Sequence, residues 1–302
     1  MNSVTMAESL LVMDHDSLKF NYALIHNTSI MKILIPFAKD QWNRNTGSEV
    51  MDMIGRETRR YRYTPHILLQ KMLLDELLGL YKIPINKTYT KQDVVDQCDR
   101  IIRAMYEEMK RNNKKFAHFI NGKDPRRIEL IMEYQMHRLI ESISDKKISD
   151  FQLHQIGDAL EEFIGSLPQQ KQKQIAHELG IFQVTSSTIR QLILSNGTTV
   201  VFAAIVQVSG FAFYTTLTTV LASVFGLIGI TLPFAAYATL TSTVAIIANP
   251  FVFLPALLIG GGGLLKWQNN KMKKAMAPVV FMHIMLGANP LLEPDWEAFI
   301  NA

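Results

Sequence analysis

The chain has 302 residues, of which 48% are hydrophobic and 19% are charged, and its formal net charge is +4. This length and composition suit one large globular domain or two small ones, and they exclude a disordered chain. The single cysteine, Cys98, excludes an intramolecular disulfide and a cysteine-rich metal site. The net charge is small and evenly mixed with acidic residues, so we expect no binding to nucleic acid. Residues 191–265 contain no Asp, Glu, Lys, Arg or His, so the average composition describes neither this segment nor its flanks.

The residues before this uncharged segment predict a series of helices. Residues 64–81 are rich in leucine, and residues 83–88 are typical of a turn. Thr90 is followed three residues later by Asp93, a weaker relative of the capping box that begins many helices. The helix that follows is predicted to bury one apolar face, formed by Val94, Cys98, Ile101, Ile102, Met105 and Met109.

Further helix starts follow along the chain. Asp124 and Pro125 fit the N-cap and the first position of a helix. Ser149 and Gln152 form a second capping signal, and Pro168 opens a shorter helix that Gly180 closes. The apolar positions of these helices are predicted to be Ile128, Ile131, Met132, Leu139 and Ile143, and then Phe151, Ile156, Leu160 and Phe163. Because no alternating strand pattern of useful length occurs, we predict an all-α fold.

Catalytic signatures are missing from the sequence. The histidines never form a His-x-x-x-His pair, and adjacent acids such as Glu107 and Glu108 point to different helix faces. We therefore expect no enzyme activity, no cofactor and no metal site. One basic cluster, accompanied by Tyr61 and Tyr63, could bind phosphate, either of nucleic acid or of lipid head groups, or it could be an ordinary charged surface. It consists of Arg56, Arg59, Arg60 and Arg62.

The uncharged segment predicts membrane-spanning helices. About 20 helical residues cross a hydrocarbon core of about 30 Å, so residues 191–265 must fold back at least once. The breaks are predicted at Gly226, Gly229, Pro233 and Pro250, where glycine and proline interrupt a helix. These breaks give a hydrophobic hairpin of two crossings, with three shorter crossings as the alternative.

Residues on both flanks of the segment are predicted to lie at the membrane interface. They are Arg190, Lys266, Trp267, Lys271, Lys273 and Lys274. Basic residues on both sides favour both ends on the cytoplasmic face, and therefore an even number of crossings. Inside the hairpin, polar and small side chains recur at Gln207, Thr215, Thr219, Ser223, Thr239, Ser242 and Asn249. This stripe could pack two helices closely or line a watery path in an oligomer.

The predicted organisation is a helical soluble domain at residues 1–190, the hairpin at residues 191–265 and a C-terminal segment at residues 266–302. The C-terminal segment begins with a basic patch and continues as the apolar residues 275–286. That stretch is too short to span a bilayer, so it either packs on the helical domain or lies at the interface.

Three blocks of sequence resemble the YaaW family of uncharacterised bacterial proteins. They are residues 72–119 (MLLDELLGLYKIPINKTYTKQDVVDQCDRIIRAMYEEMKRNNKKFAHF), residues 229–242 (GITLPFAAYATLTS) and residues 272–286 (MKKAMAPVVFMHIML). The resemblance implies a helical cytoplasmic part followed by a hydrophobic region, in a grouping that some schemes link to ubiquinol–cytochrome c chaperones. It implies no activity and no functional residue.

Two functions fit these observations. The first is a membrane-inserting effector or pore-type protein of the bacterial inner membrane, whose helical domain stays on the cytoplasmic side and shields the hairpin until insertion. The second is a membrane-anchored scaffold or assembly chaperone whose helical domain binds a protein partner. The expected partners are anionic membrane lipid and either a second copy of the chain or another protein.

Overall fold

The computed structural model describes residues 3–26, 55–86, 90–123, 127–144, 149–209, 213, 269–286 and 292–302. Every element of regular secondary structure in these ranges is an α-helix, which confirms the predicted all-α class. The chain forms two compact units. Unit 1 comprises Met1–Gln135 and Asn249–Ala302, and unit 2 comprises Met136–Ala248. These unit boundaries differ from the predicted segment boundaries after residues 190 and 265. The C-terminal helices belong to the same unit as the N-terminal helices.

Unit 1 is a helical bundle built from both ends of the chain. Its described helices are α1 (Ser3–Val12), α2 (His15–His26), α5 (His66–Leu80), α6 (Lys91–Asn112), α7 (Lys114–Phe119), α16 (Asn269–Leu286) and α17 (Trp296–Asn301), together with the first half of α8 (Arg127–Ser144). Helix α2 packs against α5, and α1 packs against α6. Buried Gln70 on α5 donates a hydrogen bond of 2.7 Å to the carbonyl of Leu11, which caps the end of α1.

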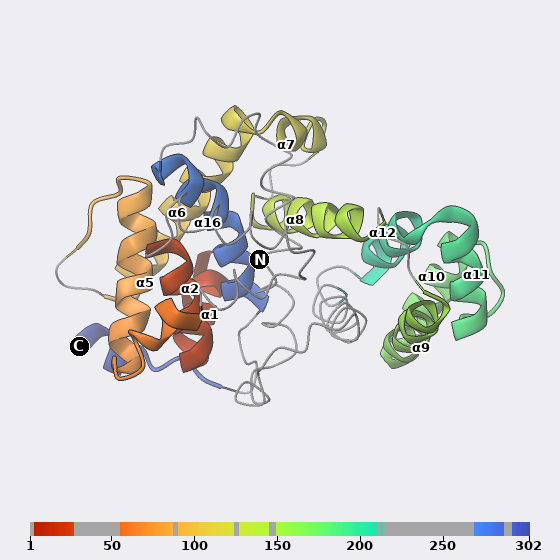
Figure 1. The fold of residues 1–302 in the computed structure, drawn as a ribbon, viewed down its shortest axis with the longest axis horizontal. Coiled ribbons are helices and arrows are strands. Elements are labelled where there is room, and N and C mark those ends of the chain that lie inside the picture. The colour runs from red at the N-terminus through yellow and green to blue at the C-terminus, as the bar shows by residue number, and fades with distance from the viewer. Residues whose placement is uncertain are drawn as a thin grey trace. The chain divides into compact units, whose positions relative to one another are not determined.

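The helix α16 forms the core of unit 1. It contacts α1, α2, α5 and α6, and Figure 1 shows it in blue among these red to yellow helices. Its side chains from Met276 to Met285 are buried, on all sides of the helix. A helix that is apolar on all sides is buried within a protein or a membrane, and here it is buried within the bundle. Of the two predicted positions for residues 275–286, packing on the helical domain is therefore confirmed.

The capping signal at Thr90 is also confirmed. The Asp93 backbone N–H donates to Thr90 Oγ1 at 3.2 Å, and the Thr90 backbone N–H donates to Asp93 Oδ2 at 2.9 Å. The predicted apolar face of α6 is buried along its length, including Cys98. Burial raises the pKa of the Cys98 thiol to about 12, and the nearby Asp99 carboxylate acts in the same direction.

This burial predicts that Cys98 reacts only when unit 1 opens. At pH 8 the folded protein should show almost no reaction with a disulfide reagent such as DTNB. The reagent cannot reach the buried sulfur atom, and burial disfavours the thiolate, which is the form that reacts. In denaturant the same thiol should react at the rate of an unfolded peptide. The absorbance of the released thionitrobenzoate measures both rates. Fast labelling of the folded protein would contradict the buried position.

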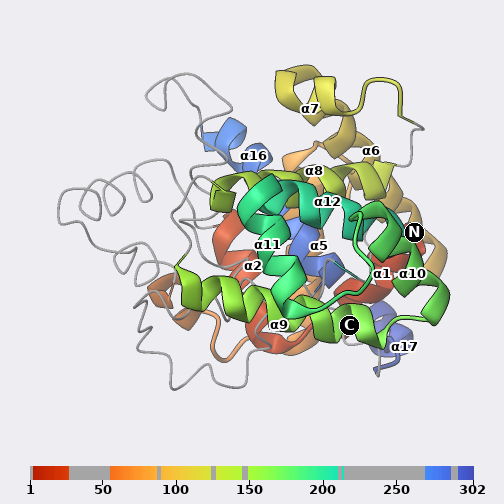
Figure 2. The same ribbon diagram turned by 90° about the vertical axis from the view of Figure 1, so that its right-hand side faces the viewer.

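Unit 2 contains four described helices that pack as a compact group, which Figure 2 shows in green. They are α9 (Asp150–Ser166), α10 (Gln169–Glu178), α11 (Ser186–Asn196) and α12 (Thr198–Ser209). The capping box of Ser149 and Gln152 begins α9 as predicted. Gly180, with a φ of 67°, ends α10, where the N–H of Ile181 donates to the carbonyl of Ala176 at 2.9 Å. The rings of Phe163, Phe202 and Phe213 meet in the core, with centroids 5.3 and 5.8 Å apart.

The first arm of the predicted hairpin differs from a spanning helix. Gly197, with a φ of 84°, separates α11 from α12, which the structure describes over Thr198–Ser209. Helix α12 packs against α10 and α11 and buries Val201, Phe202 and Ile205 in unit 2. Gln207, expected deep in the hairpin, is exposed on α12. The remaining stripe residues, the four predicted breaks, Lys266 and Trp267 lie outside the described residues.

The predicted membrane protein is contradicted by the structure. In the part of the chain that it describes, no helix combines the length and the apolar character that a bilayer crossing needs. This finding overturns the transmembrane hairpin, the pore-type effector and the location in the bacterial inner membrane. The membrane-anchored scaffold is overturned with them, because its anchor was the same hairpin. The physical reason is visible at α12, whose apolar side chains are buried by neighbouring helices of unit 2.

Candidate interaction surfaces

Two of the predicted interface lysines form ion pairs at the start of α16. Lys273 Nζ lies 2.9 Å from Glu76 Oε1 on α5, and Lys274 Nζ lies 3.3 Å from Glu108 Oε2 on α6. These pairs join residues far apart in the sequence, so they fix α16 against two helices of unit 1. Lys271, on the same helix, has a side chain outside the described set. Lys273 and Lys274 thus have a structural role in the bundle.

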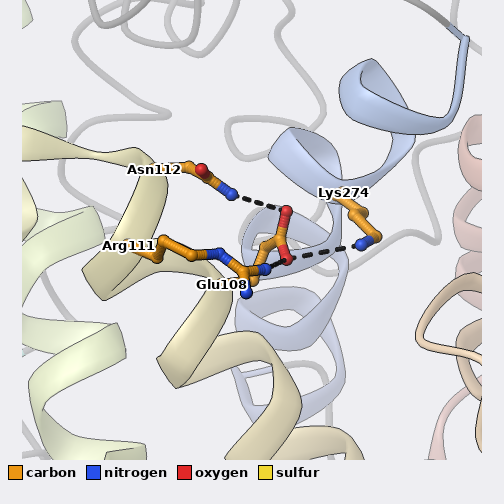
Figure 3. Close-up of polar contacts among 4 residues, drawn as sticks. All are labelled: Glu108, Arg111, Asn112 and Lys274. Carbon is orange, nitrogen blue, oxygen red and sulfur yellow. Dashed lines mark hydrogen bonds and ion pairs between the residues drawn. The ribbon is translucent and has the colours of Figure 1, made fainter.

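The carboxylate of Glu108 is fully occupied by donors. Figure 3 shows it between Arg111 and Asn112 of its own helix and Lys274 of α16. Arg111 Nη2 lies 2.5 Å from Glu108 Oε2, and Asn112 Nδ2 lies 2.7 Å from Oε1. Lys274 Nζ also lies 5.9 Å from the ring centre of Tyr81. Because three donors already bond this carboxylate and one of them comes from another helix, this cluster positions α16 against α6.

Glu76 makes unit 1 sensitive to acid. Burial alone would raise the pKa of this carboxyl, but hydrogen bonds and charges from His26, at 2.7 Å, and from Lys273 lower it below its ordinary value. Because the pKa of this carboxyl is lower in the folded than in the unfolded chain, the ionised carboxylate stabilises the fold at pH values above the unfolded pKa of about 4.3. This contribution is lost as the pH falls through the folded pKa.

We predict that the stability difference between the wild type and Glu76→Gln depends on pH in the same way. The difference should be fully present above about pH 5 and should shrink steadily as the pH falls below about 4.3. Urea unfolding followed by circular dichroism at several pH values measures it. A difference that stays constant down to pH 3 would show that the Glu76 charge contributes nothing.

The predicted arginine cluster lies on the surface of unit 1, in the segment before α5. Arg60 Nη1 forms an ion pair with Glu57 at 3.1 Å. Arg56, Arg59 and Arg62 are exposed, and none of them has an ion pair among the described residues. The structure therefore brings the predicted anion-binding residues together, and three of the four cations have no counter-ion in the part of the chain that it describes.

In unit 2, α9 and α11 form an antiparallel pair. Arg190 Nη1 donates to His154 Nε2 at 2.6 Å, and the backbone N–H of Ser186 donates to Glu161 Oε2 at 2.7 Å. Residue numbers thus rise along α9 as they fall along α11. His154 Nδ1 lies 3.3 Å from the carbonyl of Asp150, so it carries the proton and Nε2 accepts from Arg190. The predicted interface residue Arg190 is thus held between two helices of unit 2.

Large apolar side chains are exposed at one end of this helix pair. Phe151 lies one turn before His154 and is 62% exposed, and Leu194 lies one turn after Arg190 and is 68% exposed. Because His154 bonds Arg190 and the helices are antiparallel, Phe151 and Leu194 lie at the same end of the same face. Val200, in the first turn of α12, is also exposed.

Unneutralised charges accompany the apolar pair. The guanidinium of Arg190 is half-buried and has no carboxylate partner in the described part of the chain. Asp158, one turn after His154 on α9, is exposed and likewise has no ion pair there. We call Phe151, His154, Asp158, Arg190 and Leu194 the α9–α11 surface. It combines an exposed apolar patch with one cation and one anion that have no counter-ion among the described residues.

The sequence reasoning missed this surface, although a signal was present. Phe151 was counted with the apolar face of α9, whose other members Ile156, Leu160 and Phe163 are indeed buried. Ile156 lies five positions after Phe151, which at about 3.6 residues per turn places the two side chains well apart around the helix. Measuring the angular position of Phe151 would have identified it as exposed.

The described residues contain no group of three or more His, Cys, Asp or Glu side chains that could hold a metal ion. Comparisons with protein-family models, with curated proteins and with solved structures found no match. The resemblance to the YaaW family therefore stays a prediction, and function has to be inferred from the surfaces described above.

Proposed function

We propose that the chain is a self-associating helical scaffold protein that dimerises through the α9–α11 surface of unit 2. In this proposal it is a binding protein and not an enzyme. The observation that carries the proposal is the exposure of Phe151 and Leu194 beside the unneutralised Arg190 and Asp158. Aromatic residues and arginine are enriched at protein interfaces, where apolar side chains form the core and charges the rim.

A second copy is the partner that fits this surface best, because the surface complements itself. A two-fold axis that runs parallel to the helices, midway between α9 and α11, places α9 of one copy opposite α11 of the other. The residues that lie opposite one another between the two copies are then the same residues that lie opposite one another within one chain. Phe151 then faces Leu194 of the other copy, and each Arg190 comes within reach of the other copy's Asp158. Both apolar side chains lose contact with water, and both charges gain a partner.

Sedimentation equilibrium tests the proposal with charge reversal and its rescue. We expect a dimer for the wild type, and monomers for Arg190→Asp and for Asp158→Arg, because each places like charges opposite one another. The double variant Arg190→Asp/Asp158→Arg should recover the dimer. Lys173→Asp, an exposed reversal on α10, is the matched control and should stay dimeric.

Two outcomes would overturn the proposal. One is a wild type that remains monomeric at high micromolar concentration, and the other is a double variant that fails to dimerise while both single variants are folded. Circular dichroism checks the fold of each variant. Asp158 is exposed, so Asp158→Arg should fold normally even if the loss of Arg190 disturbs the contact between α9 and α11.

A further inference from the structure

The arginine segment of unit 1, residues 55–64, has an unusual regularity. Residues 55–59 form one helical turn, and the chain continues in tighter turns, where the backbone N–H of Arg60 donates to the carbonyl of Glu57 and that of Arg62 donates to the carbonyl of Arg59. In such turns, residues three apart lie above one another with a rise of about 2 Å per residue. Arg59 and Arg62 therefore lie above one another, about 6 Å apart. Arg56, three positions before Arg59 in the helical turn, is a neighbour of Arg59 on the same face, so the three arginines form a row.

The opposite face of the segment is anchored to unit 1. The ring of Tyr61 meets the ring of Tyr22 on α2 edge to face, with centroids 4.9 Å apart. Thr58 is buried, and its hydroxyl donates to the carbonyl of Gly55 at 2.9 Å. The row of arginines thus stands outward on a fixed backbone, which lowers the entropy cost of binding a ligand.

The chemistry of the row selects for phosphate. All basic residues of the segment are arginine, whose planar guanidinium binds phosphate oxygens in pairs. Glu57, its one acid, is buried and forms an ion pair with Arg60, which is not part of the row. A single phosphate would leave part of the row unpaired, whereas a polymer with a phosphate at every residue can satisfy all three.

An exposed aromatic ring stands beside the row. Tyr63 is 87% exposed, and the guanidinium of Arg62 lies 5.4 Å from its ring centre. Proteins that bind single-stranded nucleic acid combine a positive track for the backbone with aromatic rings on which bases stack. A phosphopeptide or a lipid head group has no base to stack on this ring.

From this juxtaposition we propose that the row of Arg56, Arg59 and Arg62, together with Tyr63, binds single-stranded nucleic acid through its phosphates and one stacked base. The net charge of the chain gave no reason to expect nucleic acid, because a local row of cations leaves little trace in a sum over the whole sequence. This proposal is independent of dimerisation through unit 2.

Fluorescence anisotropy with a labelled 20-nucleotide oligothymidylate tests the proposal on the full chain. The logarithm of the association constant should fall with the logarithm of salt concentration with a slope of about −2, as three phosphate contacts to a single strand require. Arg56→Gln/Arg59→Gln/Arg62→Gln should abolish most of the binding. Arg60→Gln is the matched control, and it should bind nearly as well as the wild type because Arg60 already pairs with Glu57.

Tyr63 separates nucleic acid from other polyanions. Tyr63→Ala should weaken binding at least about fivefold, the lower limit for one lost base stack, whereas Tyr63→Phe should keep the affinity. Polyglutamate of the same length and a double-stranded oligonucleotide should compete poorly. The proposal is overturned if the triple arginine variant binds as tightly as the wild type, if polyglutamate competes equally, or if Tyr63→Ala changes nothing.

Discussion

Replacing Phe281 with alanine should destabilise unit 1 by about 3–5 kcal/mol, the usual cost of removing a fully buried phenyl ring from a core. Phe281 lies in the middle of α16 and has no exposed surface. Because α16 contacts four other helices, the surrounding bundle cannot close the cavity by a simple shift of one neighbour. Urea unfolding, followed by the reactivity of Cys98, measures the loss for unit 1 alone.

The control for this experiment is Ile85→Ala. Ile85 is also a large apolar residue of unit 1, but it lies in the loop after α5 and is half-exposed. Its replacement should change the free energy of unfolding by no more than about 0.5 kcal/mol. If Phe281→Ala had an effect as small as that of Ile85→Ala, α16 would not be the core helix of unit 1.

The second large effect is expected at Gly157, where α9 and α11 approach closely. A Cβ atom at this position would lie 2.6 Å from Ser186 Oγ and 2.9 Å from the Ser186 carbonyl oxygen, distances that the structure can accept only by moving α11. Overpacking of this kind costs about 1–3 kcal/mol, and the better helix propensity of alanine offsets less than about 1 kcal/mol of it. We therefore expect Gly157→Ala to destabilise unit 2 by about 1–2 kcal/mol.

Gly165→Ala provides the matched control on the same helix. No atom lies within 4 Å of a Cβ at Gly165, so this variant gains helix propensity without a clash and should be as stable as the wild type or slightly more stable. Thermal unfolding followed by circular dichroism compares the two variants. Equal stability of Gly157→Ala and Gly165→Ala would contradict the close approach of α9 and α11.

Local signals in the sequence predicted α5, α6, α9 and α10. The capping boxes at Thr90 and Ser149 and the breaks at Pro168 and Gly180 involve residues close together in the chain, so the sequence displays them directly. The same reasoning could not predict that α16 completes a bundle begun by α1, because no local pattern specifies which distant helices bury an apolar stretch.

The membrane prediction failed for a related reason. An uncharged apolar helix has the same composition whether lipid or protein surrounds it. The length of the helix and the positions of its breaks determine whether it can cross a bilayer. The sequence predicts spanning helices over residues 191–265, but within this range Gly197 is the turn after which α12 packs back against α10 and α11. Likewise, Lys273 and Lys274 follow an apolar segment in the sequence, yet they find their counter-ions in unit 1.

Site-directed crosslinking tests the central claim, dimerisation through the α9–α11 surface, most directly. Cys98 is buried, so a cysteine placed on the surface is the main reactive thiol of the folded protein. Phe151→Cys and Leu194→Cys are prepared separately, mixed and oxidised, with Lys173→Cys as the control. We predict a covalent dimer in the mixture and none for Lys173→Cys. A mixture that stays uncrosslinked at concentrations where the wild type sediments as a dimer would contradict the account.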